Sequence, residues 1–500
     1  MERKRPLSMR LGAGISALIA PFAPQLALNR DRNLMERQII GGQASHYNAA
    51  GSGSRASDFR RNRTDAIEAG RGERERLSWI SRDMLRNNPR AVKLRRTIVG
   101  QVVGSGIAPA LIGIKGKDRD TVDALIRDHC MTTDFDVDGR LTMRGQQVLA
   151  FGATIGDGEV LIRRRLRTSR DGYALPFQTQ VLEADFLNAN IDGALAGGNF
   201  AEQGIEFDNT GRRVAYHLFE SHPGGRRGGM PKTVRVAAEN IIHLYRVDRP
   251  GQVRGVSWFA PVVTLMHELQ KYQEAQVKRQ EIAAMFAGKF TAASDPRSAN
   301  ESLGELSPGT IFHLNDGEEL DFTDPPSVDG YAEFMQITDQ VIASAMLTTY
   351  AGLTGDYSKI NYTSGRMARI DIDPVIRDLQ DNLLIATLCA GYARWIAEAV
   401  RDVTDIGLRA GDLFWTPPVR PMVDPTKDYK AAVEAMRAGL KARRATIREI
   451  GGDPAKVEDE IAEERRAAET AGLIFTSDAG QDSGRQDQDA PEDTKDMEND

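Results

Sequence analysis

The sequence predicts an α+β fold in which long amphipathic helices are combined with short β segments. Apolar residues recur at helical spacing over long stretches such as 261–287, whereas short β-prone runs are concentrated within 107–250. Two long helical patterns also flank a small β-prone insert at 289–328. With 500 residues the chain exceeds what one hydrophobic core usually organises, so we expect several folded units or one elongated subunit.

The first hundred residues divide into an irregular arm and a helical region. Residues 1–44 begin with a basic stretch and a short apolar one, a pattern also seen in secretory signals, but we expect an irregular arm. From 45 to 100 the pattern becomes helical. Asn88 is suited to cap a helix whose first residue is Pro89, and the glycines at 104–106 are suited to end it.

Short strands are expected between residues 107 and 250. Apolar or alternating runs of strand length are "EVLIRRR", "FQTQVLEADFL", "RRVAYHLFE" and "ENIIHLYRV". The Asn-Thr-Gly sequence at 209–211 predicts a hairpin turn before the third of these runs.

Two helices around a β insert form the middle of the chain. The first is expected at 261–287 and ends at Gly288; the insert carries Asp316-Gly317, a strong hairpin signal. Because the insert is short, the two helices should lie side by side, with the insert at one end and the loop that follows the second helix at the other. One face of the second helix is formed by Tyr331, Phe334, Ile337, Val341, Ala345 and Tyr350.

The C-terminal part is expected to be helical and then disordered. A helix should begin at Pro374 and run to residue 400, and two more are expected at 427–449 and 454–472. Residues 477–500 hold 9 acids against 2 bases and few apolar residues, which is typical of a disordered tail.

Charge is distributed unevenly, although the formal net charge is only −6. Residues 1–100 contain 20 Lys and Arg against 9 Asp and Glu. Such a region is suited to contact nucleic acid or acidic partners, and a solvated helix surface rich in Arg is the alternative interpretation.

No enzyme motif is present, and no metal or cofactor site is expected. The sequence lacks the P-loop, H-E-x-x-H, C-x-x-C and G-x-S-x-G patterns. The seven histidines are scattered, and acidic pairs such as Asp136/Asp138 are more typical of caps or surface charges than of a two-metal site. Two cysteines fit a reducing compartment, and no apolar run approaches the length of a membrane span, about 20 residues. These absences favour a structural protein.

Four separated stretches resemble the lambda-type family of phage portal proteins. They are "HYNAA" with "RERLSWISRDMLRNNPRAVKLRRTIVGQVVGSGI", then "IIHLYRVDRPGQVRGVSWFAPVV", "GDYSKINYTSGR" and "WTPPVRPMVDPTKDYKAAVEAMRAGL". They occur in the order of the family, and the resemblance extends from residue 46 to about 473.

The resemblance implies a homo-oligomeric ring, typically of about twelve subunits, at one vertex of the virion capsid. Such a ring is the conduit through which double-stranded DNA is packaged and ejected. It is assembled in the host cytoplasm, nucleates the procapsid with the major capsid protein or scaffold, and docks the terminase large subunit and later the head–tail connector.

The resemblance also implies the parts of a portal subunit: an α/β wing, a helical stem, a small β clip, a tunnel loop and a helical crown. The order of expected elements fits these parts. We assign them as an N-terminal arm 1–44, wing 45–256, stem helix 257–288, clip 289–328, stem helix 329–353, tunnel loop 354–366, long helix and second wing part 367–425, crown 426–473, and a disordered acidic tail 474–500.

The expected tunnel loop is nearly neutral. It combines Lys359 and Asp356 with uncharged hydrogen-bonding residues. Each neutralised phosphate adds salt-dependent affinity, and a ring multiplies each contact, so a loop that guides sliding DNA should carry little charge. We expect Lys359, Asn361 and Arg366 to face DNA. Alternatively, Tyr357, Tyr362 and Arg366 pack the base of the loop against a neighbouring subunit.

The expected clip hairpin is acidic. A basic motor or adaptor surface could dock on it, or its charges could protect a solvated hairpin edge from aggregation. The residues concerned are Glu318, Glu319, Asp321 and Asp324.

Two other functions remain as alternatives at this point. One is another capsid-shell or scaffold protein that binds only protein. The other is a packaging enzyme, a nuclease or ATPase, and the missing nucleotide-binding motif counts against it.

Overall fold

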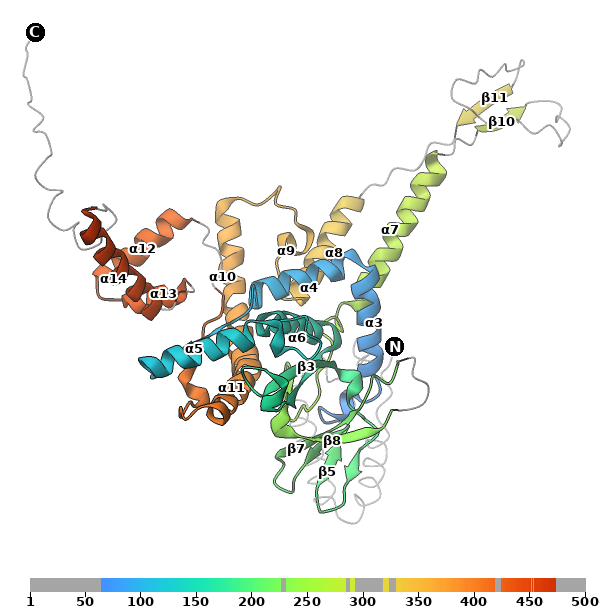
Figure 1. Cartoon of the computed structure of the whole chain (residues 1–500). Helices are drawn as coiled ribbons and strands as arrows, with labels where there is room; N and C mark the ends of the chain where they lie inside the picture. The colour runs from blue at the N-terminus through green and yellow to red at the C-terminus, as the bar shows by residue number, and fades with distance from the viewer. Residues whose placement is uncertain are drawn as a thin grey trace, which may run out of the picture. The chain divides into compact units, whose positions relative to one another are not determined.

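The computed structural model describes residues 64–225, 231–284, 288–292, 318–322, 330–418, 424–450, 452 and 454–473. Contacts between Cα atoms divide the chain into Met1–Asp65 and a compact unit, Ala66–Asp500, whose elements are labelled in Figure 1. The arm expected at 1–44 and the tail expected at 474–500 lie outside the described residues.

The unit combines helices and antiparallel sheets, which confirms the α+β class. Its helices are α3 (Arg74–Asn87), α4 (Pro89–Val102), α5 (Lys117–Cys130), α6 (Met143–Asp157), α7 (Val263–Ala284), α8 (Tyr331–Ala345), α9 (Tyr350–Thr354), α10 (Tyr362–Asp378), the π-helical η8 (Leu379–Cys389), α11 (Ala390–Val403), α12 (Pro425–Arg437), α13 (Arg443–Glu449) and α14 (Pro454–Ala471).

The strands form four sheets in the described residues, and every strand pair is antiparallel. The sheets have the orders β3-β2-β9, β4-β5-β6-β7-β8, β1-β12 and β10-β11. The strands are β1 (Pro109–Leu111), β2 (Glu159–Leu166), β3 (Phe177–Glu183), β4 (Gly193–Ala194), β5 (Phe200–Glu202), β6 (Ile205–Phe207), β7 (Arg213–Phe219), β8 (Thr233–Ala237), β9 (Ile241–Tyr245), β10 (Gly288–Ala292), β11 (Glu318–Phe322) and β12 (Leu413–Trp415).

The four strands expected from short apolar runs are confirmed as β2, β3, β7 and β9. The hairpin expected at 209–211 is also confirmed, because β6 pairs with β7 across it. Gly211 has φ 81°, and its amide donates to the carbonyl of Asp208 at 3.0 Å. The turn therefore uses glycine where the backbone is left-handed.

A single large apolar cluster joins the helices to the three-stranded sheet. Its fully buried side chains include Phe151 of α6, Phe177 of β3 and Trp395 of α11. His129 is buried among aromatic rings, with its ring centre 5.1 Å from that of Phe177, and burial lowers the pKa of His129 to about 4. His129 is therefore a packed core residue.

Asp136, one of the acidic residues weighed as a metal ligand, is instead a buried structural acceptor. Its Oδ2 accepts from the amides of Arg140 and Leu141, and its Oδ1 accepts from Gln146 at 2.9 Å. Asp136 is therefore not the surface charge that the sequence suggested, although its carboxylate does satisfy backbone amides as a cap would.

The junction of α3 and α4 forms where the sequence predicts it. Asn88 separates the two helices, and its Oδ1 accepts from the amides of Arg90 and Ala91. Its amide nitrogen donates to Gln270 of α7 at 3.1 Å, and Arg90 binds Asp339 of α8 through Nε at 2.6 Å. The cap of α4 and the two long helices are thus tied together.

A buried ion cluster depends on a close backbone approach. Gly158 has φ 92°, and a Cβ there would lie 2.3 Å from the carbonyl carbon of Val256. A Cβ on Gly255 would lie 2.1 Å from the oxygen of Gly158. Only glycines allow the two segments this contact, and it brings Arg254 beside Glu159 at the start of β2.

Three expected helices differ from the prediction. The helix expected to carry both Tyr331 and Tyr350 is divided, because α8 ends at Ala345, Leu347 has φ 55° and Thr349 caps the separate helix α9. α10 begins at Tyr362, not at Pro374, because Asn361 and Ser364 form a reciprocal capping box that starts the helix earlier. Pro374 lies inside α10 and removes one backbone hydrogen bond without ending it. The helix expected at 427–449 is split, because Leu440 donates to the carbonyl of Ala435 and closes α12 in a Schellman turn.

The continuous helix Tyr362–Val403 is long and apolar enough to cross a membrane by length and composition, although no such segment is expected from the sequence. Its apolar window has a mean hydropathy of 1.4, and 67% of that window is buried inside the protein. The buried side chains of η8 and α11 belong to the large apolar cluster, as in a core helix.

Candidate functional site

The segment between α9 and α10 is a short exposed loop. The last residue of α9 is Thr354, and Gly355, which follows it, has φ 78°. Asn361 caps α10, so the loop consists of residues 355–361. We call it the α9–α10 loop. Every residue in it is exposed. The loop expected at 354–366 is therefore shorter than predicted, because its last five residues form the first turns of α10.

The start of the α9–α10 loop is anchored to α4. Thr97 of α4 donates to the carbonyl of Gly352 at 3.0 Å, and Thr349 caps α9 by accepting from the amide of Gly352. Ala351 and Leu353 are buried. A short helix fixed in this way holds the loop on a rigid support.

The charged residues of the loop are both satisfied locally. Lys359 donates to Oε1 of Gln336 on α8 at 3.0 Å. Asp356 accepts from the amide of Ser358 at 2.9 Å, and hydrogen bonds from Ser358 lower the pKa of Asp356. With one cation and one anion, residues 355–361 have no net charge.

The other two residues expected to face DNA have local partners. The Oδ1 of Asn361 accepts from the amide of Ser364 at 2.8 Å, so its side chain starts α10. Arg366 is exposed and lies within α10, where Nη1 donates to the hydroxyl of Tyr362 at 3.3 Å. The Nζ of Lys427 on α12 also lies 5.4 Å from the centre of the Tyr362 ring. Lys359 and Asn361 thus lie on the α9–α10 loop, whereas Arg366 lies beside it.

The acidic hairpin is only partly described. β10 pairs with β11 in a register that places Glu319 opposite Thr291 and Asp321 opposite Lys289. Glu318 is the first residue of β11. Asp324 lies outside the described residues, as does the expected Asp316-Gly317 turn. Among the described residues, β11 pairs with β10, which precedes it in the chain by about 25 residues. The sequence pattern alone does not identify β10 as this partner.

One group of side chains has the composition of a metal site, and no local sequence signal predicts it. Ligand atoms of Glu183, Asp185 and His222 lie within 4.8 Å of one another. Arg82 already binds this group, since its Nη2 contacts Asp185 and its Nη1 lies 3.6 Å from Glu183. The guanidinium engages oxygens of both carboxylates and offsets part of their negative charge, so its own positive charge disfavours a divalent cation at this position.

The two cysteines also lack the features of catalytic residues. Both are free and buried, and burial raises the pKa of Cys389 to about 12 and that of Cys130 further. A thiol in such surroundings remains protonated and unreactive at neutral pH.

Part of the face expected on α8 is exposed to solvent. Phe334, Ile337 and Val341 are 49%, 61% and 53% exposed, and they share one side of the helix. We call these three residues the α8 stripe. A neighbouring side of α8 carries buried Ile342, and Met346 next to the helix end is buried in the same core. The helix is therefore apolar on two sides. The sequence spacing alone does not show which of them faces the core and which faces solvent.

The sequence matches a known protein family and known portal proteins. A model of the family "Phage portal protein, lambda family" matches residues 52–380. The probable portal protein of Halomonas phage phiHAP-1 is 26% identical over 364 residues, which cover 68% of each chain. Portal protein B of Escherichia phage lambda is 20% identical over 390 residues, covering 69% of this chain and 72% of that protein.

Solved structures with a similar backbone come from gene transfer agent (GTA) particles. A chain from the neck of a native GTA particle computed with C12 symmetry has a TM-score of 0.42 and 13% identity, covering 74% of this chain and 93% of that one. A chain from the neck of an empty particle has a TM-score of 0.44 and 12% identity, covering 77% and 97%. The family match covers more than half of the sequence, and the chain belongs to the lambda family of phage portal proteins.

Proposed function

We propose that copies of this chain close into a ring of about twelve around a channel for double-stranded DNA. The observation that carries the proposal is the family match over residues 52–380, which includes α7, α8 and the α9–α10 loop. A portal protein is a structural component of the virion at the portal vertex and not an enzyme. In the proposed ring, DNA passes the loop during packaging and ejection.

The α8 stripe supports contact between copies. Three neighbouring apolar side chains face solvent, and burying each of them fully would contribute about 1.5–3 kcal/mol. A closed ring requires two different surfaces on each copy. Met367 and Ile370, 58% and 54% exposed on α10, provide a second apolar surface. We assign the α8 stripe of one copy to the α10 surface of the next.

Ile337→Glu tests this contact. A carboxylate in an apolar interface would lose its hydration without gaining a partner, so we expect rings to be replaced by monomers or short arcs in negative-stain images. Leu166→Glu is the matched control, because Leu166 is 66% exposed on β2 and belongs to neither surface. Intact rings of the Ile337 variant, or equal loss in both variants, would contradict the assignment.

Within the ring, we assign the α9–α10 loop to the channel wall. The loop has no net charge, so it can guide the phosphate backbone without the salt-dependent affinity that clustered cations would add. Lys359, Asn361 and Arg366 are the residues proposed to meet DNA. Lys359 and Arg366 are exposed cations, and Asn361 lies between them in the chain.

The proposed docking surface for other proteins is the acidic hairpin. Glu318, Glu319 and Asp321 lie in β11, and Asp324 follows it. A basic surface of the terminase large subunit, and later of a head–tail connector, would complement these charges. Nucleation of the procapsid with the major capsid protein or scaffold is the remaining part of the proposed role.

A further inference from the structure

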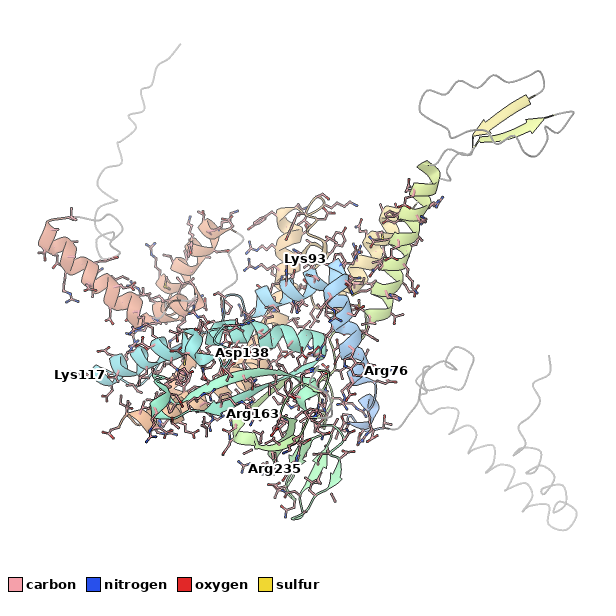
Figure 2. The ribbon with its side chains drawn as sticks, turned by 45° about the vertical axis from the view of Figure 1, so that its right-hand side comes forward. Arg76, Lys93, Lys117, Asp138, Arg163 and Arg235 are labelled. Atoms are coloured by element: carbon pink, nitrogen blue, oxygen red, sulfur yellow. The ribbon has the colours of Figure 1, made fainter. Side chains whose placement is uncertain are left out.

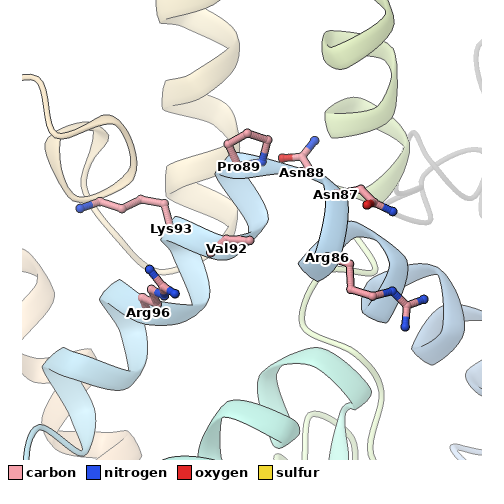
Figure 3. A pocket seen from close by; sticks show the side chains of 7 residues that line it. All are labelled: Arg86, Asn87, Asn88, Pro89, Val92, Lys93 and Arg96. Atoms are coloured by element: carbon pink, nitrogen blue, oxygen red, sulfur yellow. The ribbon is translucent and has the colours of Figure 1, made fainter.

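A groove lies at the junction of α3 and α4, away from the α9–α10 loop in the sequence. It has a volume of about 430 Å³ (Figure 3). We call it the α3–α4 groove. Its lining residues are Arg86, Asn87, Asn88, Pro89, Val92, Lys93 and Arg96.

Cationic residues surround the α3–α4 groove, whose own exposed surface is mainly apolar, whereas the whole chain has a formal net charge of −6. Three of its seven lining residues are cationic, and none is acidic. Among the described residues, the one ion pair of Arg86 is a distant contact with Asp83, at 3.9 Å between Nη2 and Oδ1. Within the described ranges, no ion pair engages Lys93 or Arg96, and both are exposed. Their charges are therefore available to an anionic ligand.

The floor of the groove is rigid, and its backbone donors are already used. The side chain of Asn88 accepts from the first free amides of α4, those of Arg90 and Ala91. Arg90 in turn is held by Asp339 and by Gln273, whose Oε1 lies 2.9 Å from Nη1. The N-terminus of α4 therefore does not offer a pocket of amides to one small anion, and attraction must come from the side chains at the rim.

The cationic side chains are arranged for an extended ligand. Figure 3 shows Arg86 leaving the end of α3, and Lys93 and Arg96 leaving α4, without converging on one point. Lys93 and Arg96 are one turn apart, with Cβ atoms about 5–6 Å from each other. Because each strand of duplex DNA carries a phosphate about every 3.4 Å of axis, cations that leave the helix in different directions can each meet a different phosphate. Arginine binds carboxylates and phosphates in the same geometry, so an acidic protein segment is the alternative ligand that the test below distinguishes from DNA.

We propose that the α3–α4 groove binds the phosphate backbone of double-stranded DNA independently of sequence. This DNA contact is separate from the one proposed for the α9–α10 loop. It rests on the proposed function in one respect, because a portal ring is what brings DNA close to the chain. Lys93 and Arg96 contact neighbouring phosphates, Arg86 adds charge at the other rim, and Pro89 and Val92 form an apolar floor beneath the sugar–phosphate chain.

The test compares two double variants of the full chain. Lys93→Gln with Arg96→Gln removes two groove cations, and Arg76→Gln with Lys430→Gln removes two exposed cations elsewhere. Arg76 lies on α3 and is labelled with Lys93 in Figure 2. Binding of a short fluorescein-labelled duplex is measured by anisotropy over a range of NaCl concentrations.

For the groove variant, we expect weaker binding and a slope of log K against log salt that is less negative by about 1.8, or about 0.9 for each of two lost contacts per bound copy. The control variant should retain the wild-type slope. Unchanged binding in the groove variant, or equal changes in both variants, would overturn the proposal. It would also be overturned if poly-L-glutamate, and not the duplex, bound in a Lys93- and Arg96-dependent way.

Negative-stain images of the same samples separate this proposal from the proposed function. If wild-type protein forms no rings but duplex binding still depends on Lys93 and Arg96, the proposed ring is wrong and the groove proposal stands. If rings form but duplex binding does not depend on these two residues, the ring stands and the groove proposal is wrong.

Discussion

Arg254→Ala is expected to lower the free energy of unfolding by about 3–5 kcal/mol, because it breaks a buried ion pair and leaves one charge without its partner. Arg254 is buried, and its Nε donates to Oε1 of Glu159 at 2.8 Å and to Oε2 at 3.0 Å. Removing the guanidinium would leave the buried carboxylate with His243 and the amide of Gly255 as its remaining partners.

The pKa of Glu159 shows why the loss is large. Burial alone would raise this pKa, but the charge of Arg254 and the hydrogen bond from His243 hold it well below the usual value of 4.5. Because the folded pKa is the lower one, this stabilisation is present above about pH 4.5 and is lost as the pH falls further. In the Arg254 variant, the free-energy cost of burying the Glu159 carboxylate remains, but the positive charge that offsets it is gone.

Guanidinium denaturation followed by tryptophan fluorescence measures the effect, since Trp258 follows Arg254 closely in the chain. Arg444→Ala is the matched control: it breaks an Arg–Glu pair with Glu458, but that pair is largely exposed to solvent. Exposed pairs contribute little, so the control midpoint should move much less. Equal midpoints for the two variants would contradict the structural role given to Arg254.

Replacing both Lys359 and Asn361 with Arg should slow DNA packaging about tenfold or stall it, while rings still form. Each copy gains one cation in the α9–α10 loop, and a charge-assisted contact with phosphate contributes about 1.5 kcal/mol, equivalent to a tenfold longer dwell. The measurement is the translocation rate in a packaging assay with purified particles and motor.

Asn361→Ala is the control for this experiment. Asn361 caps α10, and its loss would cost about 1 kcal/mol of local stability irrespective of charge. Alanine removes the cap, as arginine does, but adds no charge, so packaging should proceed near the wild-type rate. An unchanged rate in the double Arg variant would show that the loop does not line the DNA path.

Local signals in the sequence predict much of the fold. Asn88 and Pro89 mark the junction of α3 and α4, and 209–211 marks the β6–β7 turn, because capping and turn geometry depend on a few adjacent residues. The strands β2 and β9 follow from apolar runs of strand length. The α9–α10 loop is also found in the right place, with its length overestimated.

Features that depend on distant residues are not predictable in this way. Glu159, His243 and Arg254 meet only after β2 and β9 pair and two glycines allow a close backbone approach. The α8 stripe escapes prediction for a related reason, since helical spacing shows which residues share a face but not which face the core covers. The predicted helix start at Pro374 is wrong because proline is common at a helix start but not confined to it. The capping box of Asn361 instead sets the first residue of α10.

End-on class averages of the purified chain decide whether copies close around a channel and what lines it. We expect closed rings of about twelve copies with an open centre, and a gold label on a cysteine introduced at Ser358 should appear at the inner margin. A compact particle of one copy, or a ring with the Ser358 label on its outer margin, would contradict the proposed ring and its channel loop.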